Sequence, residues 1–141
     1  MVEPKSERIE HQQRRWREIL KEAAQQSGCW EIPEVDPPAD FARIVEHCKD
    51  FTYSLIPWEG EFKTGLKQVL RNIPPSQPHP QKILVLIGPE GGFSKQEIEM
   101  ACRHGIISVS LGWRILRAET ACLATLTILQ YELGEIGCEH R

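Results

Sequence analysis

The first part of the chain carries a helical pattern of apolar positions in an otherwise polar sequence. From residue 6 to about residue 26, apolar residues recur at the spacing i, i+3, i+4, i+7 and i+8, namely Trp16, Ile19, Leu20, Ala23 and Ala24. This spacing places them on one face of a helix. Gly28 follows directly and is a typical residue at a helix end. The pattern predicts a surface helix over residues 6–26 with one buried face.

Between residues 31 and 82, short blocks of helical and strand character alternate with proline-rich stretches. Phe41, Ile44 and Val45 indicate a short helix, and the β-prone run 51–56 indicates a strand. Residues 63–72 again have helical spacing, at Leu66, Val69 and Leu70. Because proline cannot lie inside a helix or an inner strand, we expect loops over 31–40 and 73–81.

The last sixty residues predict a strand, a helix, a second strand and a final helix. The run ILVLI (83–87) is apolar without alternation, which is typical of a central parallel strand buried on both faces. Ser94 and Glu97 have the spacing of a capping box, opening a helix that ends near His104. A strand over 106–111, a loop over 112–119 and a helix over 120–133 follow. The alternation predicts an α/β domain spanning 1–141, with a mainly parallel sheet flanked by helices.

Composition narrows the classes of function. The net charge of -3 gives no overall basic surface for nucleic acid, so such a partner would need a local cluster. The five cysteines form no C-x-x-C pair and suggest reduced thiols, and no apolar run approaches the roughly 18 residues of a membrane span. We therefore expect a cytoplasmic protein with no membrane role. The five histidines show no metal-ligand spacing, so no metal site is expected.

Unusual loops follow three of the predicted strands, at residues 56–60, 88–92 and 111–119. Ligands of open α/β sheets collect beyond the carboxyl ends of strands, so we expect these loops to converge on one pocket. In the middle loop, Gly88, Gly91 and Gly92 let the backbone approach a ligand, while Pro89 stiffens the turn. It has the spacing of neither a P-loop nor a dinucleotide fingerprint. The alternative is a tight structural crossover that needs glycine.

The third loop concentrates charge at a strand exit, with Arg114, Arg117 and Glu119 within six positions. One interpretation is a solvated loop with Glu119 near the positive end of the last helix. The functional interpretation places an arginine on an RNA phosphate or a target base, and Glu119 near a proton to be removed or a cation to be held. Spacing alone does not choose between these roles.

Two long motifs and a shorter one carry a family resemblance. IGPEGGFSKQEIEMA (87–101), LGWRILRAETA (111–121) and AAQQSG (23–28) resemble the RsmE-type small-subunit ribosomal RNA (uracil-N3)-methyltransferases of the SPOUT class. The resemblance covers nearly the whole chain, more loosely over 30–82, although Cys29 stands where the family typically has arginine. That family usually has an upstream PUA-like RNA-binding domain, which this chain lacks, so we expect a catalytic fragment or a naturally shortened form.

The resemblance implies a SPOUT fold with a C-terminal trefoil knot, a homodimer, and S-adenosylmethionine bound in the knot. It implies a third wall of the cofactor site at Ile56 to Glu59, including Pro57. The residues implied to line the other two walls are Leu86, Ile87, Gly88, Glu90, Gly91, Gly92, Leu111, Gly112, Ile115 and Leu116.

The implied reaction is methylation of uracil N3 in small-subunit (16S) ribosomal RNA, by in-line displacement at the sulfonium methyl. We expect Glu119 to remove or relay the N3 proton, Arg117 to stabilise the anion or orient the base, and Arg114 and Arg117 to contact RNA. Two alternatives remain open at the level of sequence. One is a SPOUT enzyme with another ribosomal or transfer RNA target, and the other is a non-catalytic RNA-binding or assembly module.

Overall fold

The computed structural model describes residues 5–73 and 82–133. By its internal contacts the chain divides into two compact units, Met1–Asp40 and Phe41–Arg141, which are described separately. Within the described residues, no helix is both long enough and apolar enough to cross a membrane.

The first unit consists of one long helix, α1 (Lys5–Ser27), and the extended segment 29–40. The predicted helix is confirmed. It ends before Gly28, where the N–H of Cys29 donates to the carbonyl of Ala24 at 2.9 Å. Within this unit most of the predicted buried face is uncovered, since Trp16 and Ile19 are 38% and 51% exposed. The unit contains no second helix or strand among its described residues against which that face could pack.

The second unit alternates helices and strands. Its elements are α2 (Phe41–Glu46), the 3₁₀ turn η1 (His47–Asp50), β1 (Tyr53–Pro57), α3 (Leu66–Arg71), β2 (Ile83–Val85), α4 (Lys95–Arg103), β3 (Ile107–Val109) and α5 (Ala118–Glu132). Each predicted helix and strand is present. The strands are shorter than the apolar runs that predicted them, and α3 begins three residues later than expected.

The three strands form one parallel sheet in the order β2-β1-β3. Tyr53 is opposite Ile83 on one side of β1, and Leu55 is opposite Ile107 on the other. The prediction of a mainly parallel sheet is confirmed, but the prediction that residues 83–87 form its centre is wrong. β1 is central and β2 is a half-buried edge strand of the described sheet. An apolar run shows that a strand is covered, and it does not show how many neighbours that strand has.

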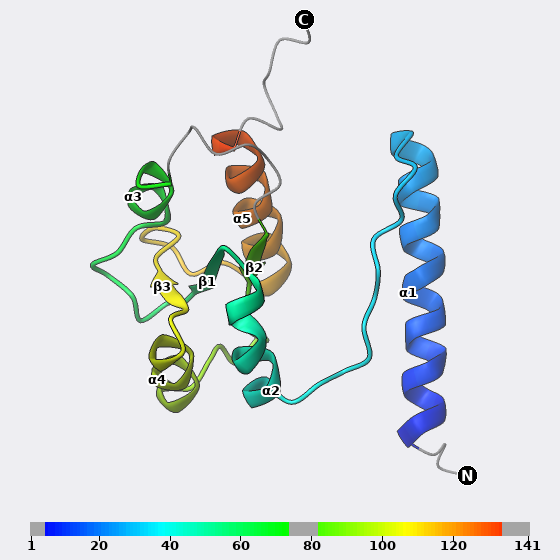
Figure 1. The fold of residues 1–141 in the computed structure, drawn as a ribbon, viewed down its shortest axis with the longest axis horizontal. Coiled ribbons are helices and arrows are strands. Elements are labelled where there is room, and N and C mark those ends of the chain that lie inside the picture. The colour runs from blue at the N-terminus through cyan, green and yellow to red at the C-terminus, as the bar shows by residue number, and fades with distance from the viewer. Residues whose placement is uncertain (1–4, 74–81, 134–141) are drawn as a thin grey trace, which may run out of the picture. The chain divides into compact units, whose positions relative to one another are not determined.

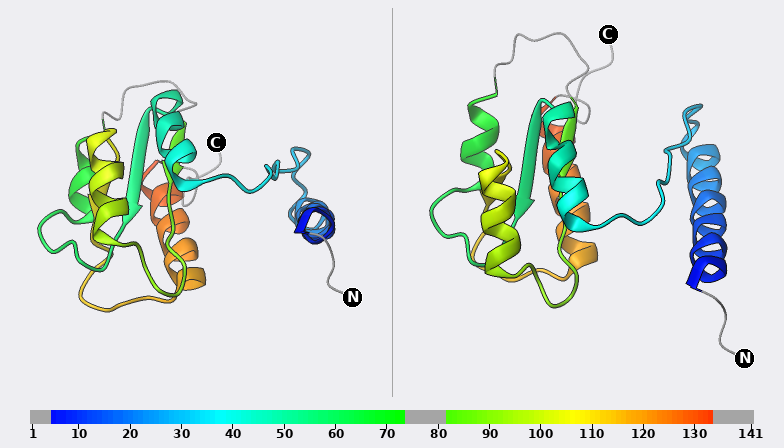
Figure 2. Two further views of the ribbon diagram at one scale, coloured as in Figure 1. Left: turned by 90° about the horizontal axis from the view of Figure 1, so that it is seen from below. Right: turned by 60° about the horizontal axis from the view of Figure 1, so that its bottom comes forward.

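Helices cover both faces of this sheet, so the unit has three layers (Figure 1). Successive residues of β1 point to opposite faces, and both Leu55 and Ile56 are fully buried. Ile56 packs with α2 and α4 in one cluster, whereas Leu55 packs with α3 and α5 in the other. Two further views show the same arrangement, with β1 between the helices (Figure 2). Parallel pairing brings the carboxyl ends of all three strands to one edge.

Candidate functional site

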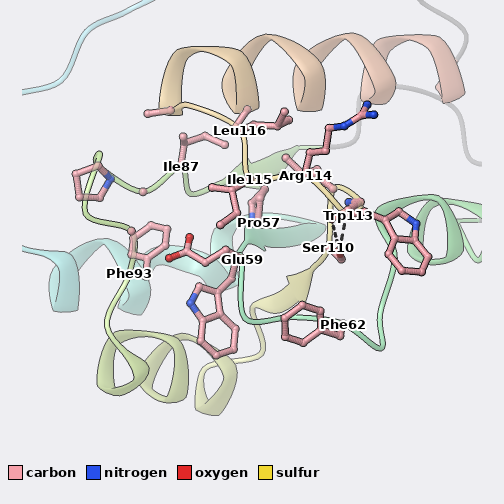
Figure 3. A pocket seen from close by; sticks show the side chains of 18 residues that line it. Pro57, Glu59, Phe62, Ile87, Phe93, Ser110, Trp113, Arg114, Ile115 and Leu116 are labelled. Atoms are coloured by element: carbon pink, nitrogen blue, oxygen red, sulfur yellow. Dashed lines mark hydrogen bonds between the residues drawn. The ribbon is translucent and has the colours of Figure 1, made fainter.

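A cavity of about 240 Å³ lies at the carboxyl ends of the strands (Figure 3). Three segments line it, each at the carboxyl end of a different strand: Pro57 to Phe62 at the end of β1, Ile87 to Phe93 after β2, and Ser110 to Leu116 after β3. The start of α5 completes the wall with Ala118 and Ala121. The prediction that the three loops converge on one pocket is confirmed.

The segment after β2, residues 86–94, is here called the glycine loop, and its own chain holds it in place. Within it, the N–H of Gly92 donates to the carbonyl of Pro89 at 2.9 Å. The ring of Phe93 packs on that of Phe41, with 5.6 Å between the centroids. The loop ends in the predicted capping box: the Ser94 hydroxyl accepts from the N–H of Glu97, and the Glu97 carboxylate accepts from the N–H of Ser94 at 2.8 Å. Its shape is thus fixed before any ligand arrives.

Gly92 is glycine for two physical reasons. Its φ is +70°, in the left-handed region that other residues rarely adopt. A Cβ at this position would also lie 2.5 Å from Oε1 of Glu59. The glycine loop and the segment after β1 therefore touch through a backbone that has no room for a side chain.

The segment after β3, residues 110–117, is here called the arginine loop, and it is much more open. Trp113 and Ile115 are 104% and 82% exposed. The loop is held at its base, where the N–H of Gly112 donates to the Ser110 hydroxyl at 3.2 Å. The N–H of Ser110 in turn donates to the carbonyl of Thr64 at 2.8 Å.

The segment after β1, residues 58–65, is organised by one carboxylate. Oε1 of Glu61 accepts hydrogen bonds from the N–H groups of Lys63 and Thr64, at 2.8 and 3.0 Å. These two bonds stabilise the ionised form and lower the pKa of Glu61 below its ordinary value of 4.5. The pKa of Glu97 is lowered in the same way, by the N–H and hydroxyl of Ser94.

Most of the residues predicted to bind a cofactor meet at this cavity. Those in its lining are Pro57, Ile87, Gly88, Gly92, Leu111, Gly112, Ile115 and Leu116. Arg114, predicted to bind RNA, also belongs to the lining. Ile56 and Leu86 lie beneath it, buried in the core cluster that packs on α4.

Besides Ile56 and Leu86, four of the predicted site residues lie outside the lining of this cavity. Glu90 and Gly91 are exposed at the turn of the glycine loop. Arg117 is the N-cap residue of α5, and Glu119 lies in the first turn of that helix. Both side chains are exposed to solvent.

Sequence reasoning overlooked three aromatic residues that line the cavity. Phe93 follows the glycine pair directly, and Trp113 stands inside the motif that carries the arginines, so both positions gave a signal. Phe62 lies in a polar stretch and had none, because only the tertiary structure brings it beside the arginine loop. Among the described residues, no group of three or more histidine, cysteine or acidic side chains could hold a metal ion.

Chemically, the cavity offers apolar walls, exposed loop backbone, one carboxylate at Glu59 and one guanidinium at Arg114. Backbone and apolar groups suit a flat or extended organic ligand better than a chain of phosphates. The fold and site therefore define a parallel α/β domain with a small-molecule site at the carboxyl ends of its strands.

The chain belongs to the RNA methyltransferase domain family, whose model matches residues 1–130. It is 39% identical over 119 residues to ribosomal RNA small subunit methyltransferase E of Mesomycoplasma hyopneumoniae. This match covers 84% of this chain and 48% of that protein. It is 35% identical over 118 residues to the Bacillus subtilis protein of the same name, covering 84% and 46%. The chain spans about half the length of these curated relatives.

A solved structure agrees with the sequence relatives. The crystal structure of a ribosomal RNA small subunit methyltransferase E from Neisseria gonorrhoeae, bound to S-adenosyl methionine, superimposes with a TM-score of 0.72. The sequence identity is 31%, and the match covers 88% of this chain and 49% of that one.

Proposed function

We propose that this chain is the catalytic domain of an S-adenosylmethionine-dependent methyltransferase acting on N3 of a uridine in small-subunit ribosomal RNA. The observation that carries the proposal is the cavity built by three loops, in a chain that resembles a cofactor-bound relative over most of its length. The names of the curated relatives support the substrate. A ribosomal substrate implies a cytoplasmic location.

The cavity fits the cofactor by the chemistry of its walls. Ile87, Ile115 and Leu116 offer apolar contact for the adenine ring, and the glycine and arginine loops offer backbone hydrogen-bonding groups. Its volume of about 240 Å³ is a little below the usual range for small-molecule sites, roughly 300–1,000 Å³. When bound, S-adenosylmethionine supplies an electrophilic methyl group on a sulfonium.

The residues of the chain then have two tasks, to position the base and to accept a proton. In the displacement, the bond from N3 to the methyl carbon forms as the bond from sulfur to that carbon breaks, and the N3 proton must already have left. We propose that Glu119 accepts that proton, directly or through water, and that Arg117 orients the base. Arg114, on the cavity rim, is assigned to RNA. The exposure of Arg117 and Glu119 leaves both accessible to a large substrate.

We further propose that the functional form is a homodimer in which α5 contributes to the interface. α5 carries charge only at Glu119 and Glu132, and its exposed residues include Leu123, Leu126 and Tyr131. A helix that is apolar around most of its circumference is normally covered. A second cavity of about 920 Å³, between α3, α5 and the arginine loop, adds to this apolar surface.

A composite active site follows from this dimer. Because Arg117 and Glu119 lie outside the lining of the cavity in their own chain, a second copy is well suited to complete the site. We also propose the trefoil knot of the SPOUT class for the C-terminal segment. It is supported by the arginine loop, which shares one cavity with both other loops and leads straight into α5. A crystal structure whose chain closes without threading would contradict the knot.

The substrate is tested by nucleoside mass spectrometry of small-subunit ribosomal RNA from a strain that lacks the gene. The expected result is loss of N3-methyluridine and its return on complementation. An unchanged N3-methyluridine signal, with another modification lost instead, would show that the enzyme acts on a different RNA target.

A further inference from the structure

The side chain of Glu59 projects into the cavity from the segment that follows β1 (Figure 3). The walls around it are mostly apolar and include Pro57, Ile87, Phe93 and Ile115. Its carboxylate forms no hydrogen bond or ion pair with another of the described residues. The loop thus presents a solvent-exposed carboxylate, with no protein partner among the described residues, at the proposed cofactor site.

The position of this carboxylate is built into the glycine loop. All three of its atoms lie within 3.1 Å of where a Cβ on Gly92 would be. A side chain at residue 92 would therefore displace the Glu59 carboxylate from the place that it occupies here. The second glycine of the pair has a role that backbone flexibility alone does not explain.

A ligand that fills this cavity has to satisfy the carboxylate. An ionised glutamate only accepts hydrogen bonds, and covering it without donors leaves its desolvation uncompensated. S-adenosylmethionine carries three donor groups, the amino group of its adenine, the paired hydroxyls of its ribose and the ammonium of its amino-acid part. Carboxylate recognition of ribose hydroxyls is a recurring solution in nucleotide-binding α/β folds.

The surroundings of Glu59 favour the ribose over the ammonium. The ammonium of the cofactor is one carbon away from a carboxylate, which would bring a second negative charge close to Glu59. A cation nearby would be needed to offset this repulsion. Arg114 is the basic residue of the cavity lining, and its guanidinium points away from Glu59 toward α5 (Figure 3).

We propose that Glu59 recognises the ribose hydroxyls of S-adenosylmethionine, and that glycine at residue 92 lets that carboxylate keep its place in the cavity. This assignment rests on the proposed function, and it names one residue that fixes how the cofactor lies. Glu59 is a binding residue in this account and takes no part in proton transfer.

The test is calorimetric titration of the full chain with two ligands, S-adenosylmethionine and 5′-methylthioadenosine. The second ligand keeps the adenine and ribose and lacks the amino-acid part. Its 2′-deoxy form, titrated alongside, keeps the adenine amino group and lacks one ribose hydroxyl, so Glu59→Gln should weaken it less. Equal weakening of the two forms would show that Glu59 contacts the adenine and would overturn the ribose assignment. Glu59→Gln should weaken both ligands by about 10-fold, since it removes one charge-assisted hydrogen bond, and Glu59→Ala should weaken them further. Glu46→Gln is the matched control, because Glu46 is an exposed carboxylate of α2 outside the cavity. It should bind both ligands as the wild type does.

Each other outcome has a distinct meaning. Wild-type affinity in Glu59→Gln, with binding by the wild type intact, would overturn the assignment and leave the proposed function standing. If the variant binds S-adenosylmethionine more weakly but 5′-methylthioadenosine with unchanged affinity, Glu59 contacts the ammonium. This result would overturn the ribose assignment. If the wild-type dimer binds neither ligand, the proposed function fails, and the assignment fails with it.

A double-mutant cycle tests the role of Gly92. Gly92→Ala should weaken both ligands, and much less so in a Glu59→Ala background, because the collision with the carboxylate is then gone. Gly105→Ala is the matched control: φ is +90° there, but an added Cβ would meet nothing within 4 Å. Its effect should be the same in both backgrounds. Equal effects of Gly92→Ala in the two backgrounds would overturn the coupling.

Discussion

The glycine loop and the arginine loop face the same cavity, yet they are built differently. Residues 86–94 are fixed by contacts within the chain: the Phe93–Phe41 packing and the capping box of α4. Residues 110–117 expose Trp113 and Ile115 to solvent and are anchored mainly at Ser110. The difference suggests that one loop is preformed for the cofactor and that the other is completed by RNA and a second subunit.

The largest expected effect falls on the exposed side of this comparison. Glu119→Gln should lower the rate of methyl transfer by about 100-fold or more, because the proposed proton acceptor is lost. The affinity for S-adenosylmethionine should stay the same, since Glu119 lies outside the cavity lining. Single-turnover methylation of ribosomal RNA measures the rate, and calorimetry measures the affinity for S-adenosylmethionine. Nearly normal turnover would remove Glu119 from the proton transfer.

A somewhat smaller effect is expected on subunit association. Leu123 is 68% exposed on α5, and Leu123→Glu would place a charge in the proposed apolar interface. The dissociation constant of the dimer should rise by about 10-fold or more. Sedimentation or light scattering over a range of concentrations measures it. Leu123→Met, which keeps the surface apolar, should leave the dimer intact, and equal behaviour of the two variants would count against an interface on this face.

On the preformed side, loss of the cap should affect folding stability. Ser94→Ala removes the side-chain acceptor for the N–H of Glu97 and should cost about 1 kcal/mol of unfolding free energy. Urea unfolding measures this cost. Ser94→Asp keeps a good N-cap and serves as the control. If alanine were as stable as wild type, the glycine loop would not owe its shape to this helix end.

The sequence predicted the capping box and the end of α1 because both are local. Ser94 and Glu97 are three residues apart, and Gly28 directly follows the helix that it ends. The run 83–87 identified a strand but not its place in the sheet, which depends on partners distant in sequence. The same limit applies to Trp16 and Ile19, since helical spacing defines a face without supplying what covers it.

The candidate site was predictable to a similar degree. Motif residues at the ends of three strands indicated one pocket, and the structure brings eight of the twelve predicted cofactor residues into its lining. The contact between Glu59 and Gly92 was not predictable, because it joins loops that are more than thirty residues apart. The position of Phe62 in the cavity was not predictable either, because only the tertiary structure brings it beside the arginine loop.

The smallest expected effect concerns the segment after β1. The pKa of Glu61 is lowered by the N–H groups of Lys63 and Thr64, so its ionised form stabilises the fold. This contribution is present above the unfolded-state pKa, near the ordinary value of 4.5, and is lost as the pH falls through the lower folded-state pKa. Unfolding of wild type and Glu61→Gln should therefore differ most near neutral pH and converge once the pH is below the lowered folded-state pKa. A constant difference across this range would contradict the proposed cause.

The central claim is that the three loops bind S-adenosylmethionine, and titration calorimetry of the full chain with this ligand tests it most directly. The account predicts saturable binding with one site per chain, abolished or strongly weakened by Gly92→Ala. A folded chain that gives no heat of binding at millimolar ligand would contradict it.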